Sequence, residues 1–277
     1  MTAVTATTRP TGTDHALIAG AEEIVGVESL ASISLEQILQ QAALMTRVDR
    51  KYVIPVASLG PLMRRLRSDA AVLEIDGARR FAYRSTYWDT PELAAFTMAG
   101  QGRRRRFKVR TRTYLNSGDS FLEVKTRGPR GTSVKVRMPY AGDGAVLEPA
   151  AQDFVREAFA DAGVPDVGVD ALRPTLVTTY LRSTLVAADG RGTPTRATID
   201  TALAWESTGD AGGVLDLPGL AIVETKGSSI PSSVDRALWR LQHRPIRVSK
   251  YGTGMAALHA DLPNLKWHNV LRRHLDH

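Results

Sequence analysis

The chain has 277 residues, 43% of them hydrophobic, with 36 Lys+Arg against 29 Asp+Glu for a formal net charge of +7, and it has no cysteine. The lack of cysteine excludes disulfide scaffolds, thiolate metal sites and cysteine nucleophiles. No window approaches the roughly 18 apolar residues of a membrane span and no signal-peptide pattern is present, so we expect a cytoplasmic protein with no membrane segment.

Residues 1–28 are rich in Thr, Ala and Gly without hydrophobic periodicity, which predicts a flexible leader followed by a single domain over 29–277. Capping residues at Ser34 and Ser58 predict two short helices, and Asp89 with Pro91 predicts a third through residue 98. After Gly102 the hydrophobic period changes to two, the period of strands. Strands are predicted over 46–54, 71–75, 80–88, 103–114, 119–127, 132–139, 173–186, 195–206 and 219–227, and further helices over 149–162, 231–243 and 267–274.

The predicted strands carry charge on one face only. Alternation along residues 106–112 puts apolar side chains on one side and, on the other side, Arg106, Lys108, Arg110 and Arg112. The same scheme recurs in the later strands, whose charged sides carry Glu123, Lys125, Arg127, Lys135, Arg137, Arg182, Arg196, Asp200, Glu224 and Lys226.

Two arrangements explain this pattern. One is an ordinary antiparallel sheet with its apolar face on helices and its charged face in water. A solvated face normally mixes both signs of charge, however, whereas this face is mostly Arg and Lys. We therefore favour an α+β fold, a closed eight-stranded antiparallel β-barrel with flanking helices and cations lining its bore. Because dehydrating uncompensated charge is costly, such a bore must hold water and accept a polyanion.

Eight short motifs follow one another along the chain: RVDRKY at 47–52, YWDTPEL at 87–93, KVRTR at 108–112, FLEVK at 121–125, RP at 173–174 with YLR at 180–182, RATID at 196–200, VETK at 223–226 and SKY at 249–251. Their order resembles the VTC-type polyphosphate polymerase domain of the triphosphate tunnel metalloenzymes, over about residues 31–257. The resemblance implies an eight-stranded antiparallel tunnel that binds nucleotide or triphosphate with a divalent metal. The Glu-x-Glu-x-Lys motif of the adenylate-cyclase and thiamine-triphosphatase branches is absent, which argues against those activities.

The resemblance also implies residue roles. The catalytic phosphate-binding cations are expected to be Lys51, Arg110, Arg112, Lys125, Arg182, Arg196 and Lys250. Cofactor contacts are expected from Lys125, Lys135, Arg137 and Lys226, and metal ligation from Glu224 and Glu123. Glu123 and Glu224 each lie two residues before a lysine, so charge compensation within the strand is the alternative for both.

The implied function is a metal-dependent polyphosphate polymerase that transfers the terminal phosphoryl group of ATP onto a polyphosphate chain. Two alternatives stay open: a triphosphate or polyphosphate hydrolase with Glu123 or Asp200 as base, and a non-catalytic polyphosphate-binding module. We expect Mn²⁺ or Mg²⁺ instead of zinc, since the six histidines are scattered. The expected partners are ATP and polyphosphate. No specific nucleic acid is expected, and an unidentified membrane partner stays an open alternative.

Overall fold

The computed structural model describes residues 26–42, 48–128, 132–142, 145–209 and 213–275. Residues 1–25 of the predicted leader and the first two residues of the strand predicted over 46–54 lie outside the described residues. Val27 and Leu30 are buried in the same apolar cluster as Met63. The leader over 1–28 and the single domain over 29–277 stay predictions.

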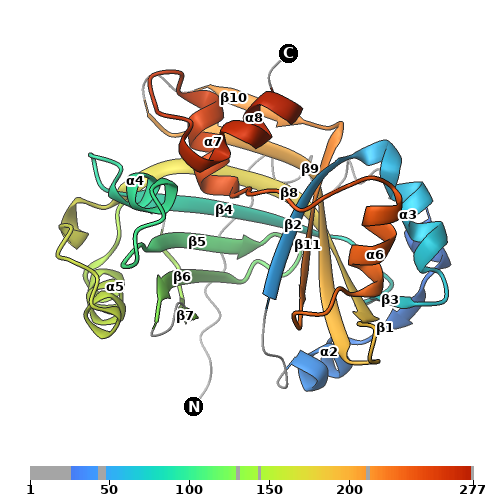
Figure 1. Ribbon diagram of the computed structural model, residues 1–277. Coiled ribbons are helices and arrows are strands. Elements are labelled where there is room, and N and C mark those ends of the chain that lie inside the picture. Colours follow the sequence, from blue (N-terminus) through green and yellow to red (C-terminus); the bar gives the residue numbers. More distant parts are fainter. Residues whose placement is uncertain (1–25, 43–47, 129–131, 143–144, 210–212, 276–277) are drawn as a thin grey trace.

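The main sheet has the strand order β2-β11-β9-β8-β4-β5-β6-β7, and every neighbouring pair in it is antiparallel (Figure 1). In that order the strands are β2 (Val48–Pro55), β11 (Leu220–Gly227), β9 (Pro194–Ser207), β8 (Arg173–Ala188), β4 (Phe81–Asp89), β5 (Lys108–Tyr114), β6 (Ser120–Arg127) and β7 (Ser133–Pro139). Three short strands flank it: β10 (Val214–Leu217) beside β9, β3 (Ala70–Leu73) beside β8, and β1 (Ala31–Ile33) parallel to β3. The predicted α+β class, with one large antiparallel sheet, is confirmed.

The predicted closure of the barrel is wrong. Among the described residues no strand pairing joins β2 to β7, the two end strands of the order. β7 is instead an exposed edge, with Val134 and Val136 exposed on one face and Lys135 on the other. Alternation predicts the face that a residue takes, but it carries no information about which strand an edge finds as its partner.

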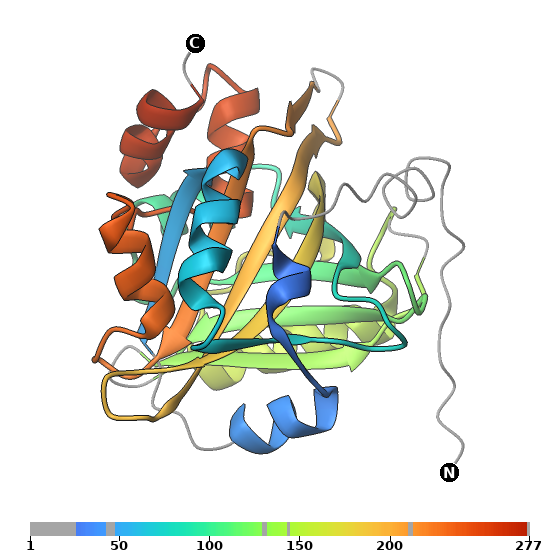
Figure 2. The ribbon, with the colours of Figure 1, turned by 90° about the vertical axis from the view of Figure 1, so that its right-hand side faces the viewer.

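Helices cover the apolar face of the sheet in two groups. α3 (Leu59–Leu66) and α6 (Ser233–Arg240) pack over β2, β11, β9 and β8, where Leu62 and Leu238 share a buried cluster with Ile54 and Val223 (Figures 1 and 2). Toward the other end of the strand order, α5 (Pro149–Ala162) packs against β6. This arrangement leaves the charged face of the strands uncovered by these three helices.

The remaining helices are α2 (Leu35–Ala42), α4 (Ala94–Gly100), α7 (Lys250–Leu258) and α8 (His268–His274). α7 has no counterpart in the sequence prediction, and the strand predicted from residue 103 begins only at Lys108. α7 contains Gly252 and Gly254, which disfavour helix but are required here. A Cβ on Gly252 would lie 1.9 Å from the Trp267 ring, and one on Gly254 would lie 2.9 Å from Leu176. In the described part of the chain no helix combines the length and the apolar character that a membrane crossing requires.

Candidate functional site

The strand register places the predicted charged residues on one face of the sheet. Residues directly opposite one another on paired strands point to the same face. The register pairs are Lys51 with Glu224, Lys226 with Asp49 and Arg196, Arg182 with Asp200, Arg110 with Glu123, Lys108 with Lys125, Lys125 with Lys135, and Glu123 with Arg137. The alternation in each strand therefore predicts the correct face, and seven strands contribute to one charged surface.

The sheet curls so that its distant strands meet across this charged face. β2 and β6 are six places apart in the strand order, which in a flat sheet would separate them by about 29 Å. Lys51 on β2 and Lys226 on β11 nevertheless lie near enough to Lys125 on β6 to change its pKa. Burial lowers the pKa of Lys125, Asp49 and Glu224 raise it, and Lys51 and Lys226 lower it further, for a net decrease. The open sheet therefore still brings these side chains together.

Glu224 is the first of three carboxylates that each hold two cations. Its Oε1 lies 3.0 Å from Lys51 Nζ and 3.1 Å from Lys226 Nζ. Burial alone would raise the pKa of Glu224, but the two lysines hold it well below its usual range. The side chain stays 19% exposed.

Asp200 on β9 is the second carboxylate. It receives a bidentate pair from Arg182, with Nε at 2.6 Å and Nη2 at 2.8 Å, and a further contact from Lys250 Nζ. Burial opposes ionisation here too, yet Arg182 and Lys250 lower the pKa of Asp200 to about 2. The Lys250 ammonium also lies 4.4 Å from the ring centre of Tyr180. The helix absent from the sequence prediction, α7, thus supplies a predicted site residue.

Glu123 on β6 is the third carboxylate and is 3% exposed. Arg110 reaches it with Nε at 2.7 Å and Nη2 at 2.5 Å, and Lys135 Nζ contacts its other oxygen. Arg110 and Arg112 are the main charges that overcome burial and hold the pKa of Glu123 far below its ordinary value.

Other cations of this face have mainly cations as neighbours. Burial, Arg110, Lys125 and Lys51 all lower the pKa of Lys108, which falls well below its ordinary value. Arg112 is buried, with its guanidinium 5.6 Å from the Tyr83 ring centre. Glu224, Asp200 and Glu123 are thus each engaged by two cations, and further cations remain beside them. We name the set the cation cluster: Asp49, Lys51, Lys108, Arg110, Arg112, Glu123, Lys125, Lys135, Arg137, Arg182, Arg196, Asp200, Glu224, Lys226 and Lys250.

Asp89, which the sequence predicted to cap a helix, and Tyr251, which the sequence placed only in a motif, hold α7 in place. Asp89 is fully buried and accepts hydrogen bonds from the backbone N–H groups of Thr90, Ala95 and Phe96, which caps α4. The Tyr251 hydroxyl donates to the same carboxylate. Because Tyr251 follows Lys250 directly, this contact fixes the helix end that carries the lysine. The motifs at 87–93 and 249–251 were the available signal for the contact.

The charged face offers an incomplete set of metal ligands. Across the residues that the structure describes, no group of three His, Cys, Asp or Glu side chains is placed to hold a metal ion. Mg²⁺, however, often takes only one or two protein carboxylates and completes its shell with water and substrate phosphates. Glu224 fits that partial role, since its side chain is 19% exposed, against 3% for Glu123. Glu123 fits it less well because both of its oxygens contact cations.

Comparison with known proteins bears on the same residues. A family model described as the VTC domain matches residues 46–259. This range includes all fifteen residues of the cation cluster. Comparison with curated proteins finds no match.

Solved structures give a weaker likeness. A candidate adenylate cyclase from Bacillus halodurans is 14% identical over 74% of this chain and 96% of its own, with a TM-score of 0.43. A candidate adenylyl cyclase from Hippeastrum, described as having a dominant triphosphatase activity, is 14% identical over 79% of this chain and 98% of its own, also at 0.43. A candidate adenylate cyclase from Vibrio parahaemolyticus is 14% identical over 76% of this chain and 97% of its own, with a TM-score of 0.42. With TM-scores below 0.5, these structures add nothing to the assignment made from the domain match.

Proposed function

Since the chain belongs to the VTC domain family, we propose that the protein is a metal-dependent polyphosphate polymerase that transfers the terminal phosphoryl group of ATP onto a polyphosphate chain. The observation that carries this proposal is the meeting of Lys51 on β2 with the paired residues Lys108 and Lys125 on β5 and β6, five and six places away in the strand order. A cluster of cations with too few carboxylates is unfavourable in the free protein and suits a ligand with closely spaced negative charges.

The reaction asks little of the protein beyond position and charge. The terminal oxyanion of the chain attacks the γ-phosphorus of ATP, the bond from that phosphorus to the β–γ bridging oxygen breaks, and ADP leaves with the electron pair. Planar guanidinium groups such as those of Arg110 and Arg182 bind two phosphate oxygens at once, and lysines add point charge. Such preorganised cations stabilise the charge of the transition state. We assign phosphate binding to Lys51, Arg110, Arg112, Lys125, Lys135, Arg137, Arg182, Arg196, Lys226 and Lys250.

Glu224 is the residue we assign to the divalent metal, together with phosphate oxygens of the substrate. When bound, Mn²⁺ or Mg²⁺ neutralises charge on the β- and γ-phosphate oxygens. Lys51 and Lys226 keep the Glu224 carboxylate ionised, so it is ready to act as an oxygen ligand.

The state of the other carboxylates favours transfer to a chain over hydrolysis. A hydrolase needs a base to take a proton from the attacking water. Glu123 and Asp200 are the candidates, but each is bound by two cations and the pKa of Asp200 is about 2. Carboxylates this acidic are poor proton acceptors, whereas the terminal phosphate of a chain already carries its negative charge.

The test is to incubate the full chain with ATP and Mn²⁺ and to resolve the products on a gel. We expect a series of polyphosphate bands, and we expect Glu224→Gln to abolish them while tripolyphosphate still binds. Glu206→Gln, on an exposed carboxylate of β9, is the matched control and should leave synthesis unchanged. Release of inorganic phosphate alone would identify a hydrolase, and binding without any turnover would identify a non-catalytic module; either result contradicts the proposal.

A further inference from the structure

A short segment beyond the VTC match brings a lysine to the charged face. Lys266 lies in a 3-10 turn (Leu265–Trp267), seven residues past the end of the matched range at residue 259. Trp267 anchors the turn: its ring is buried, lies 5.1 Å from the ring of Phe96 and packs directly on Gly252 of α7. Lys266 Nζ donates a hydrogen bond to the Ala99 carbonyl. The ammonium is therefore held in place by the fold.

Lys266 joins three arginines at one end of the charged face. Lys108 and Lys125 are register partners on β5 and β6, and Arg106 and Arg127 lie two residues further along these two segments, in the same direction. Lys266 and Arg106 come together at the end of α4, where Lys266 donates to the Ala99 carbonyl and Arg106 donates to the Gly102 and Arg103 carbonyls. Burial and the guanidinium groups of Arg106, Arg247 and Arg127 lower the pKa of Lys266. Lys266 in turn acts on Lys108, which belongs to the cation cluster. The four residues thus continue the cation cluster outward.

This end differs from the centre in the charges that its lysine feels. In the cation cluster, a carboxylate lies within ion-pair distance of each of four lysines: Lys51, Lys135, Lys226 and Lys250. The charges that act on Lys266 are guanidinium groups. Arg106 satisfies part of its hydrogen-bonding capacity with backbone carbonyls, Arg103 O at 2.7 Å and Gly102 O at 3.3 Å. Like charges gathered in this way repel one another, and an anion placed among them would relieve that repulsion.

We propose that Lys266 and Arg106, with Arg127 and Arg247, form an outer phosphate subsite that binds the units of a polyphosphate chain extending beyond the cation cluster. This inference rests on the proposed function, because it presumes that the cation cluster holds linked phosphates. It follows that the subsite contributes to the binding of long chains and contributes nothing to tripolyphosphate, which the cation cluster accommodates. The C-terminal segment outside the family match, through Lys266, therefore contributes to chain-length selectivity.

The test compares two ligands by titration calorimetry with the full chain, without nucleotide or added metal. The wild type should bind a long-chain polyphosphate more tightly than tripolyphosphate. The double variant Lys266→Gln/Arg106→Gln should lose about tenfold or more in long-chain affinity, the usual scale for losing hydrogen bonds to a charged group, and should bind tripolyphosphate within about twofold of the wild type. The single variant Lys266→Arg, which keeps the charge, should retain most of the long-chain affinity of the wild type.

Arg64→Gln/Arg65→Gln is the matched control, since it removes the same charge from exposed positions of α3 on the opposite face. It should change neither affinity by more than about twofold. Equal loss for both ligands, no loss for either, or the same loss in the control would overturn the subsite. So would a variant that loses affinity for a single-stranded oligonucleotide but not for long-chain polyphosphate. A wild type that binds neither phosphate ligand would refute the proposed function as well, whereas failure of ATP-dependent synthesis with intact chain-length dependence would refute the polymerase alone.

Discussion

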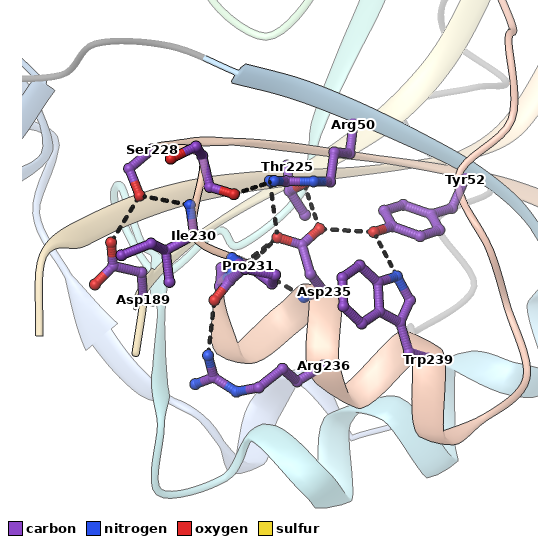
Figure 3. Close-up of polar contacts among 12 residues, drawn as sticks. Arg50, Tyr52, Asp189, Thr225, Ser228, Ile230, Pro231, Asp235, Arg236 and Trp239 are labelled. Carbon is purple, nitrogen blue, oxygen red and sulfur yellow. Dashed lines mark hydrogen bonds and ion pairs between the residues drawn. The ribbon is translucent and has the colours of Figure 1, made fainter. Parts of the chain in front are cut away.

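Two groups of charged residues lie on opposite faces of the same sheet, and they are built differently. On the apolar face, which α3 and α6 cover, Asp235 of α6 is 1% exposed. It accepts hydrogen bonds from the hydroxyls of Tyr52 and Thr225, both at 2.7 Å (Figure 3). It also accepts from the backbone N–H and the hydroxyl of Ser232, at 2.8 and 2.9 Å, and lies 3.5 Å from Arg50. One carboxylate is thus surrounded mainly by neutral donors that tie α6 to β2 and β11.

The cation cluster has the opposite balance. Glu224, Asp200 and Glu123 each hold two cations, and Lys108 stands beside them with further cations as neighbours. A balanced network such as that around Asp235 gains nothing from a ligand and serves to hold the fold together. An unbalanced one keeps its repulsion until an anion arrives, which is the physical reason to regard it as a binding site.

Arg110→Ala should give the largest effect that separates the two faces. It removes a guanidinium group from the proposed phosphate site, so ATP-dependent synthesis should fall by on the order of 10³. The unfolding free energy of the ligand-free protein should fall by less than the roughly 3 kcal/mol typical of breaking a buried ion pair, because Lys135 and Arg112 remain beside the Glu123 carboxylate and the repulsion on Lys108 is relieved. Steady-state rates and thermal unfolding measure the two quantities. A collapse of the melting temperature would mean that this arginine is structural.

Asp235→Ala should show the reverse pattern, with a smaller effect. The variant loses the cap of α6 and leaves the hydroxyls of Tyr52 and Thr225 without their acceptor, so stability should fall by about 3 kcal/mol. Asp235→Asn keeps an acceptor and should lose less. Below the melting temperature of Asp235→Ala, activity per folded molecule should match the wild type; a loss of activity without a loss of stability would erase the distinction between the two faces.

The local sequence pattern was enough to predict which face of the sheet each charged side chain of a strand occupies, and so most residues of the cation cluster. Alternation in residues 106–112 and 121–127 correctly places Arg110, Glu123 and Lys125 on the charged face, because side-chain direction in a strand is a local property. The capping residues of α6, Ser232 and Asp235, mark a helix inside the range predicted over 231–243. These features depend on neighbours within a few residues.

Features that depend on distant contacts were not predictable. The open edge between β2 and β7 follows from how the whole sheet curls, which alternation does not encode. α7 was missed because Gly252 and Gly254 weaken its helical pattern, while their purpose, close approach of Trp267 and Leu176, appears only in three dimensions. Lys266 belongs to no motif and reaches the charged face through the packing of Trp267.

Proton uptake on ligand binding gives the smallest but most specific effect, through Lys108. Its pKa is lowered in the folded protein, so between that folded value and the unfolded value of about 10.4 the unfolded chain binds more protons. Stability of the ligand-free protein should therefore rise with pH across this window. A phosphate ligand beside the ammonium favours the charged form and should reverse the shift.

The most direct test of the account is a titration of the ligand-free protein with tripolyphosphate in buffers of different ionisation enthalpy, at a series of pH values from neutral up to the ordinary lysine pKa of about 10.4 and without added metal. We expect one tripolyphosphate per chain and a net uptake of protons by the protein, with the uptake reduced in Lys108→Met. Absence of binding, or binding with no proton uptake that depends on Lys108, would contradict the claim that the uncompensated cations of this face exist to hold linked phosphates.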